Sequence, residues 1–402
     1  MIDGIDCKVI VVGGGPIGLY TSYLIKKNNP DLFVIVIDNH KKIGSSVCCS
    51  GLIGINGYNK TKLSKLVSLN DFLVNKIKGA NIYSSLKTKF IVAPSEYKAY
   101  VINRSLFDKK IAELAISVGV IIENYKTVTK VNDKSVVVKD LKTNASQEVG
   151  FDYLIGADGP NSIVKESIVL ENQLNDYNNK EFIHAYQVVV SGKFNKEKVK
   201  VYFGNFAKGL FAWIIPESTT VARIGIGTSL GHNPKLSFEK FIKKFDLKFN
   251  SKISECSGIL PISKPLNNIA TTNKIVVGDA ASFVKATTGG GINFGLISAE
   301  MAEKAISERI NNFKPLNSIN GLLSKNIKEL KVHYKIKNII LSKTDVEFDE
   351  FLQKLNKLEI NKVLEKTGDM DYILSFLKNI VLKPKYFLFV MKEYKDLIKF
   401  LR

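Results

Sequence analysis

The stretch that decides the fold is VIVVGGGPIG, at residues 9–18. Its apolar start predicts a short buried strand, and Gly13, Gly15 and Gly18 stand at the G-x-G-x-x-G spacing that opens a helix after such a strand. The first glycine permits a tight turn, the second lets backbone N–H groups approach a phosphate, and the third lets helix and strand pack closely. We therefore expect a βαβ unit with an anion site at the helix N-terminus.

A second apolar strand, at residues 33–37, ends at Asp38. This acid follows Gly18 by about 20 residues, the spacing at which a carboxylate accepts hydrogen bonds from a ribose. No basic residue replaces it. The order of strand, turn, helix, strand and acid predicts a dinucleotide site.

A second glycine-rich segment, GDAASFVKATTGGGI at residues 278–292, lies far downstream. An apolar strand at residues 275–277 precedes Asp279, and Gly291 and Ile292 open a helix. This second site narrows the cofactor to FAD. We expect Asp279 to meet the ribityl or pyrophosphate region, and the N–H groups of Gly291 and Ile292 to meet the polar edge of the flavin ring.

Further segments carry a resemblance to a known family. They are NRSLFD at residues 103–108 and ADGPNS at residues 157–162. With the 278–292 segment, they resemble the motifs of the para-hydroxybenzoate-hydroxylase-like flavoproteins. Within that group the chain is most similar to the geranylgeranyl reductases, through CSGLI at 49–53, FAWIIP at 211–216 and TTGGGI at 287–292. The likeness covers nearly the whole chain and is loosest after about Phe313.

The resemblance implies cofactor contacts for single residues. Ser50 and Gly51 would contact the flavin. Arg104 would neutralise the pyrophosphate or brace the adenosine, and Val128 would contact adenine through its backbone. Asp158 would either contact the cofactor or hold its turn by backbone hydrogen bonds.

Cys49 is the candidate catalytic residue that the resemblance selects, because Gly51 follows it as in the family's Cys-x-Gly segment. A thiol with an ordinary pKa of about 8.5 is mostly protonated at neutral pH and can donate a proton. Cys49 would be this proton source or a contact of the flavin. An inert buried cysteine is the alternative.

The FAWIIP motif implies that Phe211, Trp213 and Pro216 bind the substrate. An aromatic face favours cationic character nearby, although plain core packing is the alternative role for aromatics in strands. Ile215 stands where the family usually has an aromatic residue, and Ala286 where it usually has proline. These two departures leave the substrate specificity open.

The order of these signals predicts an α/β protein. We expect a Rossmann-type FAD-binding domain, an antiparallel-sheet substrate-binding domain and a helical C-terminal region. The FAD-binding domain would comprise residues 1–58, 98–175 and 270–312. The substrate-binding domain would comprise residues 59–97 and 176–269, and the helical region residues 313–402. A hairpin is expected at 127–138.

Composition favours a cytoplasmic enzyme. The chain has 402 residues, 45% of them hydrophobic, so it can bury a large core. It shows no secretory signal and no apolar run near the ~20 residues of a membrane span. Its four cysteines, Cys7, Cys48, Cys49 and Cys256, are too few for a disulfide scaffold and match no zinc site. We expect no bound metal, and the scattered histidines receive no catalytic role.

The net charge of +20 predicts attraction to polyanions and anionic membranes, unless it only reflects a lysine-rich composition. An amphipathic helix expected after Pro384 would pack on the core or rest on the inner membrane face, where the protein would be peripheral. Nucleic acid is not an expected partner, because no basic residues interleaved with stacking aromatics are evident.

The resemblance implies an FAD-dependent reductase that saturates carbon–carbon double bonds of geranylgeranyl chains in archaeal-type ether lipids. Its partners would be a prenylated phospholipid and an electron donor, either reduced nicotinamide, a deazaflavin or ferredoxin. The sequence does not distinguish these donors. One alternative is a flavin-dependent monooxygenase or halogenase. Another is a basic flavoprotein whose main role is binding RNA or a membrane.

Overall fold

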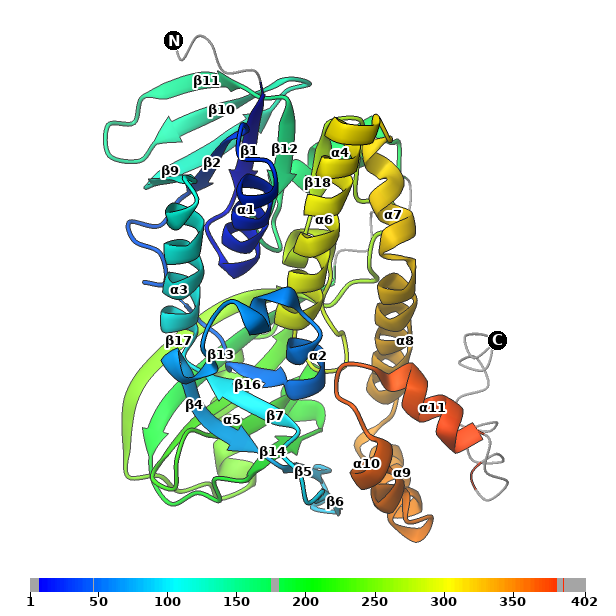
Figure 1. Cartoon of the computed structure of the whole chain (residues 1–402). Coiled ribbons are helices and arrows are strands. Elements are labelled where there is room, and N and C mark those ends of the chain that lie inside the picture. The colour runs from blue at the N-terminus through cyan, green and yellow to red at the C-terminus, as the bar shows by residue number, and fades with distance from the viewer. Residues whose placement is uncertain (1–6, 46, 175–180, 382–385, 387–402) are drawn as a thin grey trace.

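A parallel sheet forms the upper half of the molecule in the computed structural model, which describes residues 7–45, 47–174, 181–381 and 386 (Figure 1). The strand order is β18-β12-β1-β2-β8. The bounds are β1 Lys8–Val12, β2 Phe33–Asp38, β8 Ile121–Asn124, β12 Tyr153–Gly156 and β18 Lys274–Val276. All neighbouring pairs run parallel, with Val11 opposite both Ile155 and Val36. Strands β1, β2 and β12 inside the sheet are mainly apolar, as expected for a sheet covered on both faces, whereas the edge strand β8 ends in Glu123 and Asn124.

Helix α1 (Pro16–Asn28) begins where the glycine spacing predicts. Gly15 is its N-cap and Pro16 occupies the first turn, where a missing N–H costs nothing. A Cβ built on Gly18 would lie 2.0 Å from the Gly13 carbonyl oxygen, so only glycine permits this close approach. Helix α1 packs on α3 (Arg104–Ser117) and α6 (Ile292–Asn312). The predicted βαβ unit is confirmed.

Three antiparallel strands extend this half of the fold: β9 (Lys126–Val131), β10 (Ser135–Asp140) and β11 (Ser146–Gly150). They confirm the hairpin expected at 127–138. The next helix, α4 (Ile163–Glu171), is capped by Ser162, whose side chain accepts a hydrogen bond from the Lys165 backbone N–H.

A seven-stranded sheet forms the lower half in Figure 1, in the order β17-β13-β16-β15-β14-β5-β6. Its strands are β5 Gly79–Tyr83, β6 Lys89–Val92, β13 Phe182–Ser191, β14 Lys198–Tyr202, β15 Gly209–Pro216, β16 Val221–Ser229 and β17 Ser251–Pro261. Neighbours are antiparallel except β14 and β5, which run parallel. Side chains alternate along β15, so Ala212 and Ile214 pack towards α5 (Pro234–Lys244), while Phe211 and Trp213 face the other side.

A small sheet joins the two halves in the order β3-β7-β4, next to the short helix α2 (Ile55–Asn59). Its strands are β3 Leu52–Gly54, β4 Leu73–Ile77 and β7 Ala99–Ile102. All are paired antiparallel. This sheet follows the Cys49–Gly51 segment directly and so fixes its position.

The C-terminal part is helical, as expected. Its helices are α7 Ile319–Leu322, α8 Ser324–Leu341, α9 Asp345–Lys357, α10 Ile360–Thr367 and α11 Ile373–Val381. Helix α9 starts with a capping box between Thr344 and Glu347, and α9 and α10 pack on β6. The amphipathic helix expected after Pro384 lies outside the described residues. Within the described part of the chain, no helix is long and apolar enough to span a bilayer.

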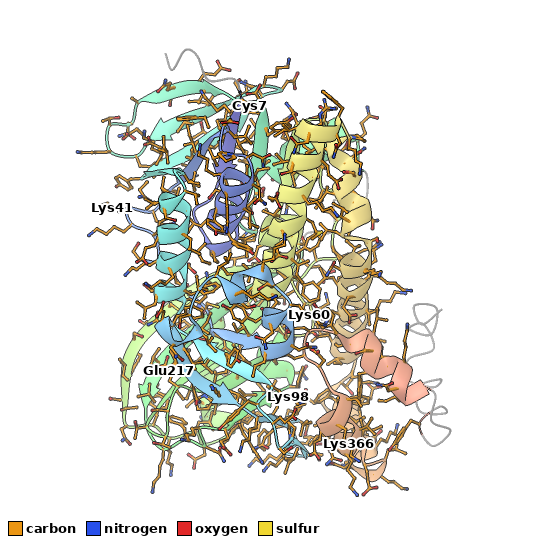
Figure 2. The ribbon with its side chains drawn as sticks, in the orientation of Figure 1. Cys7, Lys41, Lys60, Lys98, Glu217 and Lys366 are labelled. Atoms are coloured by element: carbon orange, nitrogen blue, oxygen red, sulfur yellow. A yellow bond between two sulfur atoms is a disulfide. The ribbon has the colours of Figure 1, made fainter. Side chains whose placement is uncertain are left out.

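The observed architecture confirms the predicted α/β fold class. The three domain ranges given above stay a prediction. Figure 2 shows Cys7 at one end of the molecule and Lys98, which lines the cavity, towards the other.

The contact between β12 and α4 provides a test of packing. A Cβ built on Gly156 would lie 2.6 Å from the Val164 Cβ and 2.8 Å from the Val276 Cγ1 atom. We expect Gly156→Ala to lower the free energy of unfolding by about 1–3 kcal/mol, because this core has no room for a methyl group. The control is Gly150→Ala, whose new Cβ would meet nothing nearer than 3.8 Å. Urea denaturation measures both; equal stability of the two variants would contradict the packing argument.

Candidate functional site

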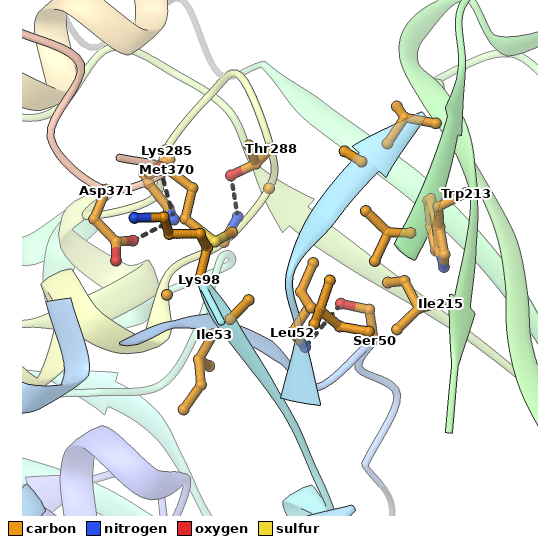
Figure 3. Close-up of a pocket in the computed structure, with 18 of the residues that line it drawn as sticks. Ser50, Leu52, Ile53, Lys98, Trp213, Ile215, Lys285, Thr288, Met370 and Asp371 are labelled. Carbon is orange, nitrogen blue, oxygen red and sulfur yellow. Dashed lines mark hydrogen bonds and ion pairs between the residues drawn. The ribbon is translucent and has the colours of Figure 1, made fainter. Parts of the chain in front are cut away.

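A cavity of about 450 Å³ lies between the two halves of the molecule (Figure 3). Five parts of the chain line it: the seven-stranded sheet, the segment 48–54, the ends of β4 and β7 with the residues beside them, the glycine-rich segment 285–293 and the segment 364–371 of the C-terminal region. Segments far apart in the sequence therefore build one site.

The wall formed by the seven-stranded sheet is apolar. It includes Ile82, Val199, Val201, Leu210, Phe211, Trp213, Ile215 and Leu260. The rings of Phe211 and Trp213 meet edge to face, with centroids 6.1 Å apart. A Cβ on Gly225 would lie 2.3 Å from the indole ring, so this glycine on β16 makes room for Trp213. Pro216 does not line the cavity; its carbonyl accepts a hydrogen bond from Asn75.

The Cys49–Gly51 segment forms a second wall and is held by two side chains of the sheet. Gln187 donates to the Cys49 carbonyl at 3.2 Å and accepts from the Trp213 indole N–H at 3.1 Å. Arg223 donates to the Ser50 carbonyl at 2.7 Å. Gly51 has φ +68°, a conformation that suits glycine. Gln187 and Arg223 were not predicted from the sequence, although a polar residue within an apolar strand is the signal that could have identified them.

A disulfide joins Cys48 on this segment to Cys256 on β17. The two Cα atoms are 5.6 Å apart, and 208 positions separate the residues in the sequence. Cys256 faces Gln187 in the register of β17 and β13. Cys7 and Cys49 are free thiols. This disulfide was not predicted from the sequence, because cysteine spacing alone does not determine pairing.

The predicted dinucleotide residues gather at the start of α1. Asp38 accepts hydrogen bonds from the Gly14 N–H at 2.7 Å and the His40 N–H at 2.9 Å. A Cβ built on Gly15 would meet no atom within 4 Å, so space is open at this helix N-terminus. Val128 is buried on β9, in the neighbouring three-stranded sheet.

Arg104, Cys49 and Asp279 come together although they are distant in sequence. Arg104 binds Asp108 through two hydrogen bonds, of 2.9 and 3.0 Å. Burial opposes its charge, but Asp108 and the Cys49 thiol nearby raise the pKa of Arg104. Burial raises the pKa of Asp279, and the charges of Arg104 and Lys165 partly oppose this. A Cβ on Gly291 would lie 2.7 Å from the Asp279 carboxylate, so the acid and the start of α6 are adjacent.

One carboxylate oxygen of Asp158 accepts a backbone hydrogen bond, and the other has no hydrogen-bond partner among the described residues. Oδ2 accepts the Ile163 N–H at 2.8 Å and so holds the turn before α4. Oδ1 is buried without a hydrogen-bond partner among the described residues. Burial raises the pKa of this carboxyl. Asp158 therefore holds the turn before α4 through Oδ2, and its Oδ1 atom can still accept a hydrogen bond from a ligand.

A charged wall faces the apolar one across the cavity (Figure 3). The Lys285 ammonium lies 2.5 Å from Asp371 Oδ1 and 3.2 Å from the Met370 carbonyl oxygen. The Asn293 side chain donates to Asp371 Oδ2 and to the Gly54 carbonyl, each at 3.0 Å. A Cβ on Gly54 would lie 2.0 Å from Asp371 Oδ2. This cluster was not predicted from the sequence, since no local pattern indicates that residues 285 and 371 meet.

His333 supports this wall from behind. Its Nδ1 atom lies 2.6 Å from the Thr287 hydroxyl, and its Nε2 atom lies 3.3 Å from the Asp371 carbonyl. Burial, and then the nearby charge of Lys285, lower the pKa of His333 to about 3. Its imidazole is therefore neutral at physiological pH. In the described part of the chain, no group of three or more His, Cys, Asp and Glu side chains is placed to hold a metal ion.

Known proteins resemble this chain over most of its length, although no family model matches it. An uncharacterized protein of Methanocaldococcus jannaschii is 30% identical, over 91% of this chain and 92% of the relative. A digeranylgeranylglycerophospholipid reductase of the same organism is 28% identical, over 97% of this chain and 98% of the relative. The relatives therefore span both halves of the fold and the C-terminal region.

Solved structures share the fold. A geranylgeranyl bacteriochlorophyll reductase-like protein from Thermoplasma acidophilum has a TM-score of 0.80 at 23% identity, covering 97% of this chain and 99% of its own. A flavin-dependent brominase has a TM-score of 0.65 at 15% identity, covering 97% of this chain and 99% of its own. The same arrangement of sheets thus occurs in a reductase-like protein and in a halogenase.

The low pKa of His333 predicts a pH dependence of stability. Between pH 6.5 and pH 3 the unfolded chain binds a proton that the folded protein excludes, so the free energy of unfolding falls as the pH falls through this window. Between pH 7 and pH 5 this loss amounts to about 2 kcal/mol. We expect His333→Gln to lose less stability over that interval, and His184→Gln to behave as the wild type. Urea denaturation at both pH values tests this; parallel losses in all three proteins would refute it.

Proposed function

Because the chain belongs to the geranylgeranyl reductase family, we propose that it saturates carbon–carbon double bonds in the geranylgeranyl chains of archaeal-type ether phospholipids, with FAD as its cofactor. The apolar cavity between the two sheets carries this proposal, because a prenyl chain needs a long wall without polar groups. Names of relatives over nearly the full chain support it.

The residues present fit FAD. The open N-terminus of α1 at Gly15 suits a pyrophosphate, whose charge Arg104 would offset. Asp38 is placed at the end of β2, where a ribose-binding acid is expected. Two buried acceptors, Asp158 Oδ1 and Asn293 Oδ1, have no partner among the described residues and could accept hydrogen bonds from the cofactor. When bound, the reduced cofactor supplies a hydride.

The apolar wall would bind the prenyl chain and exclude water. An isolated alkene has no carbonyl group to take up charge, so hydride addition needs proton delivery and stabilisation of positive character on carbon. Phe211 and Trp213 would provide aromatic faces for this. Trp213 is held by Gln187 and by the space above Gly225, so its ring has a fixed orientation.

Cys49 would supply the proton to the alkene carbon that does not receive the hydride. Its thiol lines the cavity and is free, in contrast to Cys48 beside it. The thiolate left behind would be stabilised by the Arg104 guanidinium nearby and would regain a proton from water. Ser50 and Gly51 would position the thiol against the flavin through the contact of Arg223 with the Ser50 carbonyl.

The phospholipid head group would lie where the cavity meets solvent. Lys78 and Lys98 line the cavity, and their side chains are 30% and 36% exposed. Their charges would attract a phosphate, and the net charge of +20 would favour peripheral contact with an anionic membrane. The electron donor would be reduced nicotinamide, a deazaflavin or ferredoxin.

A flavin-dependent monooxygenase or halogenase is the second candidate, since a brominase shares the fold. Oxygen-dependent consumption of reduced nicotinamide, stimulated by an aromatic compound, would favour it. A mainly binding role, towards RNA or a membrane, is the third. Salt-sensitive RNA binding without lipid turnover would favour that role.

The proposed activity can be tested without knowing the physiological donor. The FAD-loaded protein is reduced with dithionite under nitrogen and mixed with an unsaturated diether phospholipid. We expect mass spectrometry to show stepwise gains of two hydrogens per double bond. Unchanged lipid in the presence of fully reduced flavin would contradict the proposal.

Two single cysteine substitutions test whether Cys49 is the proton source. We expect Cys49→Ser to slow hydrogen uptake by about 100-fold, because a hydroxyl is a much weaker acid than a thiol. FAD binding should persist. Cys7→Ser is the matched control, since Cys7 is the other free thiol and lies at the far end of the molecule (Figure 2). An unchanged rate in Cys49→Ser would exclude Cys49 as the donor.

A further inference from the structure

The charged wall of the cavity contains a buried ion pair that the proposed reaction does not use. The side chains of Lys285 and Asp371 are 4% and 1% exposed. Taking both charges out of water costs free energy that their attraction seldom recovers, so a buried pair is weak evidence for a purely stabilising role. Its position beside the prenyl site suggests a role towards a ligand.

The Lys285 ammonium has capacity for one more acceptor. A lysine ammonium carries three N–H groups. Among the described residues, hydrogen bonds from Nζ reach two acceptors, the Met370 carbonyl and Asp371 Oδ1. Lys285 also lines the cavity. One N–H group of this cavity-lining lysine therefore has no hydrogen-bond partner among the described residues.

A closed loop brings this ammonium to the start of α6. The Lys285 N–H donates to the Gly290 carbonyl at 3.2 Å, and the Gly289 N–H donates back to the Lys285 carbonyl at 2.8 Å. A Cβ built on Gly290 would lie 3.4 Å from Nζ. The next residues, Gly291 and Ile292, carry the N–H groups expected at the polar edge of the flavin. The lysine charge and the positive end of the helix dipole thus lie on the same side of the cavity.

Asp371 holds the lysine from the C-terminal region. It reaches Gly54 and Asn293 as well as Lys285, and built Cβ atoms on Gly54 and Gly57 would lie only 2.0 and 2.3 Å from its Oδ2 atom. Glycine at both positions lets the carboxylate approach the backbone. The segment before α11 therefore fixes the direction in which the ammonium points.

We propose that Lys285 is a cation that faces the polar edge of the bound flavin and raises its reduction potential, and that Asp371 is its positioning residue. This inference rests on the proposed FAD site. On reduction the ring takes up two electrons and one proton and gains one negative charge, which a nearby ammonium stabilises. The positive charge would allow weaker electron donors to reduce the bound FAD.

Potentiometry on the FAD-loaded full-length protein tests this inference. Dithionite supplies the electrons and is oxidised to sulfite, and a reference dye reports the potential. We expect Lys285→Met to make the reduction equilibrium at least tenfold less favourable, about 30 mV lower for a two-electron couple. Lys285→Arg should stay close to the wild type, because the positive charge remains.

Two further variants distinguish an effect of Lys285 on the flavin potential from a purely structural role. The double variant Lys285→Met with Asp371→Asn leaves no unpaired buried charge, and we expect its potential also to fall, by less than in Lys285→Met. Lys274→Met is the control, since Lys274 is equally buried and paired with Glu171 at 2.7 Å but does not line the cavity. The reduction potential of FAD in Lys274→Met should equal that in the wild type.

The outcomes distinguish the two proposals. If the wild type binds no FAD or leaves the lipid unchanged, the proposed function fails. If it binds FAD and reduces lipid, but Lys285→Met keeps the wild-type potential, the role of Lys285 is refuted. An equal shift in Lys274→Met would refute it too, because the effect would then not depend on the cavity.

Discussion

The site depends on the buried carboxylate of Asp371, which packs against the backbone of two glycines, Gly54 and Gly57. Asp371 comes from the C-terminal region and contacts Lys285 on the glycine-rich segment, Asn293 at the start of α6 and the backbone at Gly54. Glycine at 54 and 57 is what allows this approach. Because all these segments line the cavity, the same contact fixes its charged wall and joins the C-terminal region to the glycine-rich segment, to the start of α6 and to β3 of the small sheet.

The cavity has opposite electrostatic character on its two walls. The sheet presents Phe211, Trp213 and aliphatic side chains, whereas the loops present an ion pair and a helix N-terminus. Alkene reduction requires such a division, since the hydrocarbon must stay dry while the redox ring needs polar contacts on its edge. Strand alternation supplies the first wall, because every second residue of β15 points into the cavity.

Local sequence patterns predicted the local structure. The glycine spacing predicted β1 and α1, the apolar run at 33–37 predicted β2, and the hairpin expected at 127–138 corresponds to β9 and β10. The contacts that assemble the site were not predictable in this way. Lys285 and Asp371, Arg223 and Ser50, and Cys48 and Cys256 are pairs whose members lie far apart in the chain, and nothing near either member specifies the other. Only the folded chain brings them together.

The strand order of the parallel sheet has a consequence for biosynthesis. Strand β12 lies between β1 and β18, but β18 is made only after the whole seven-stranded sheet has been synthesised. During translation the outer edge of β12 thus stays unpaired while more than a hundred further residues emerge from the ribosome. An open edge of this kind is a template for aggregation. Slow translation or chaperone binding across residues 157–273 would therefore decide how much of the newly made chain reaches the native state.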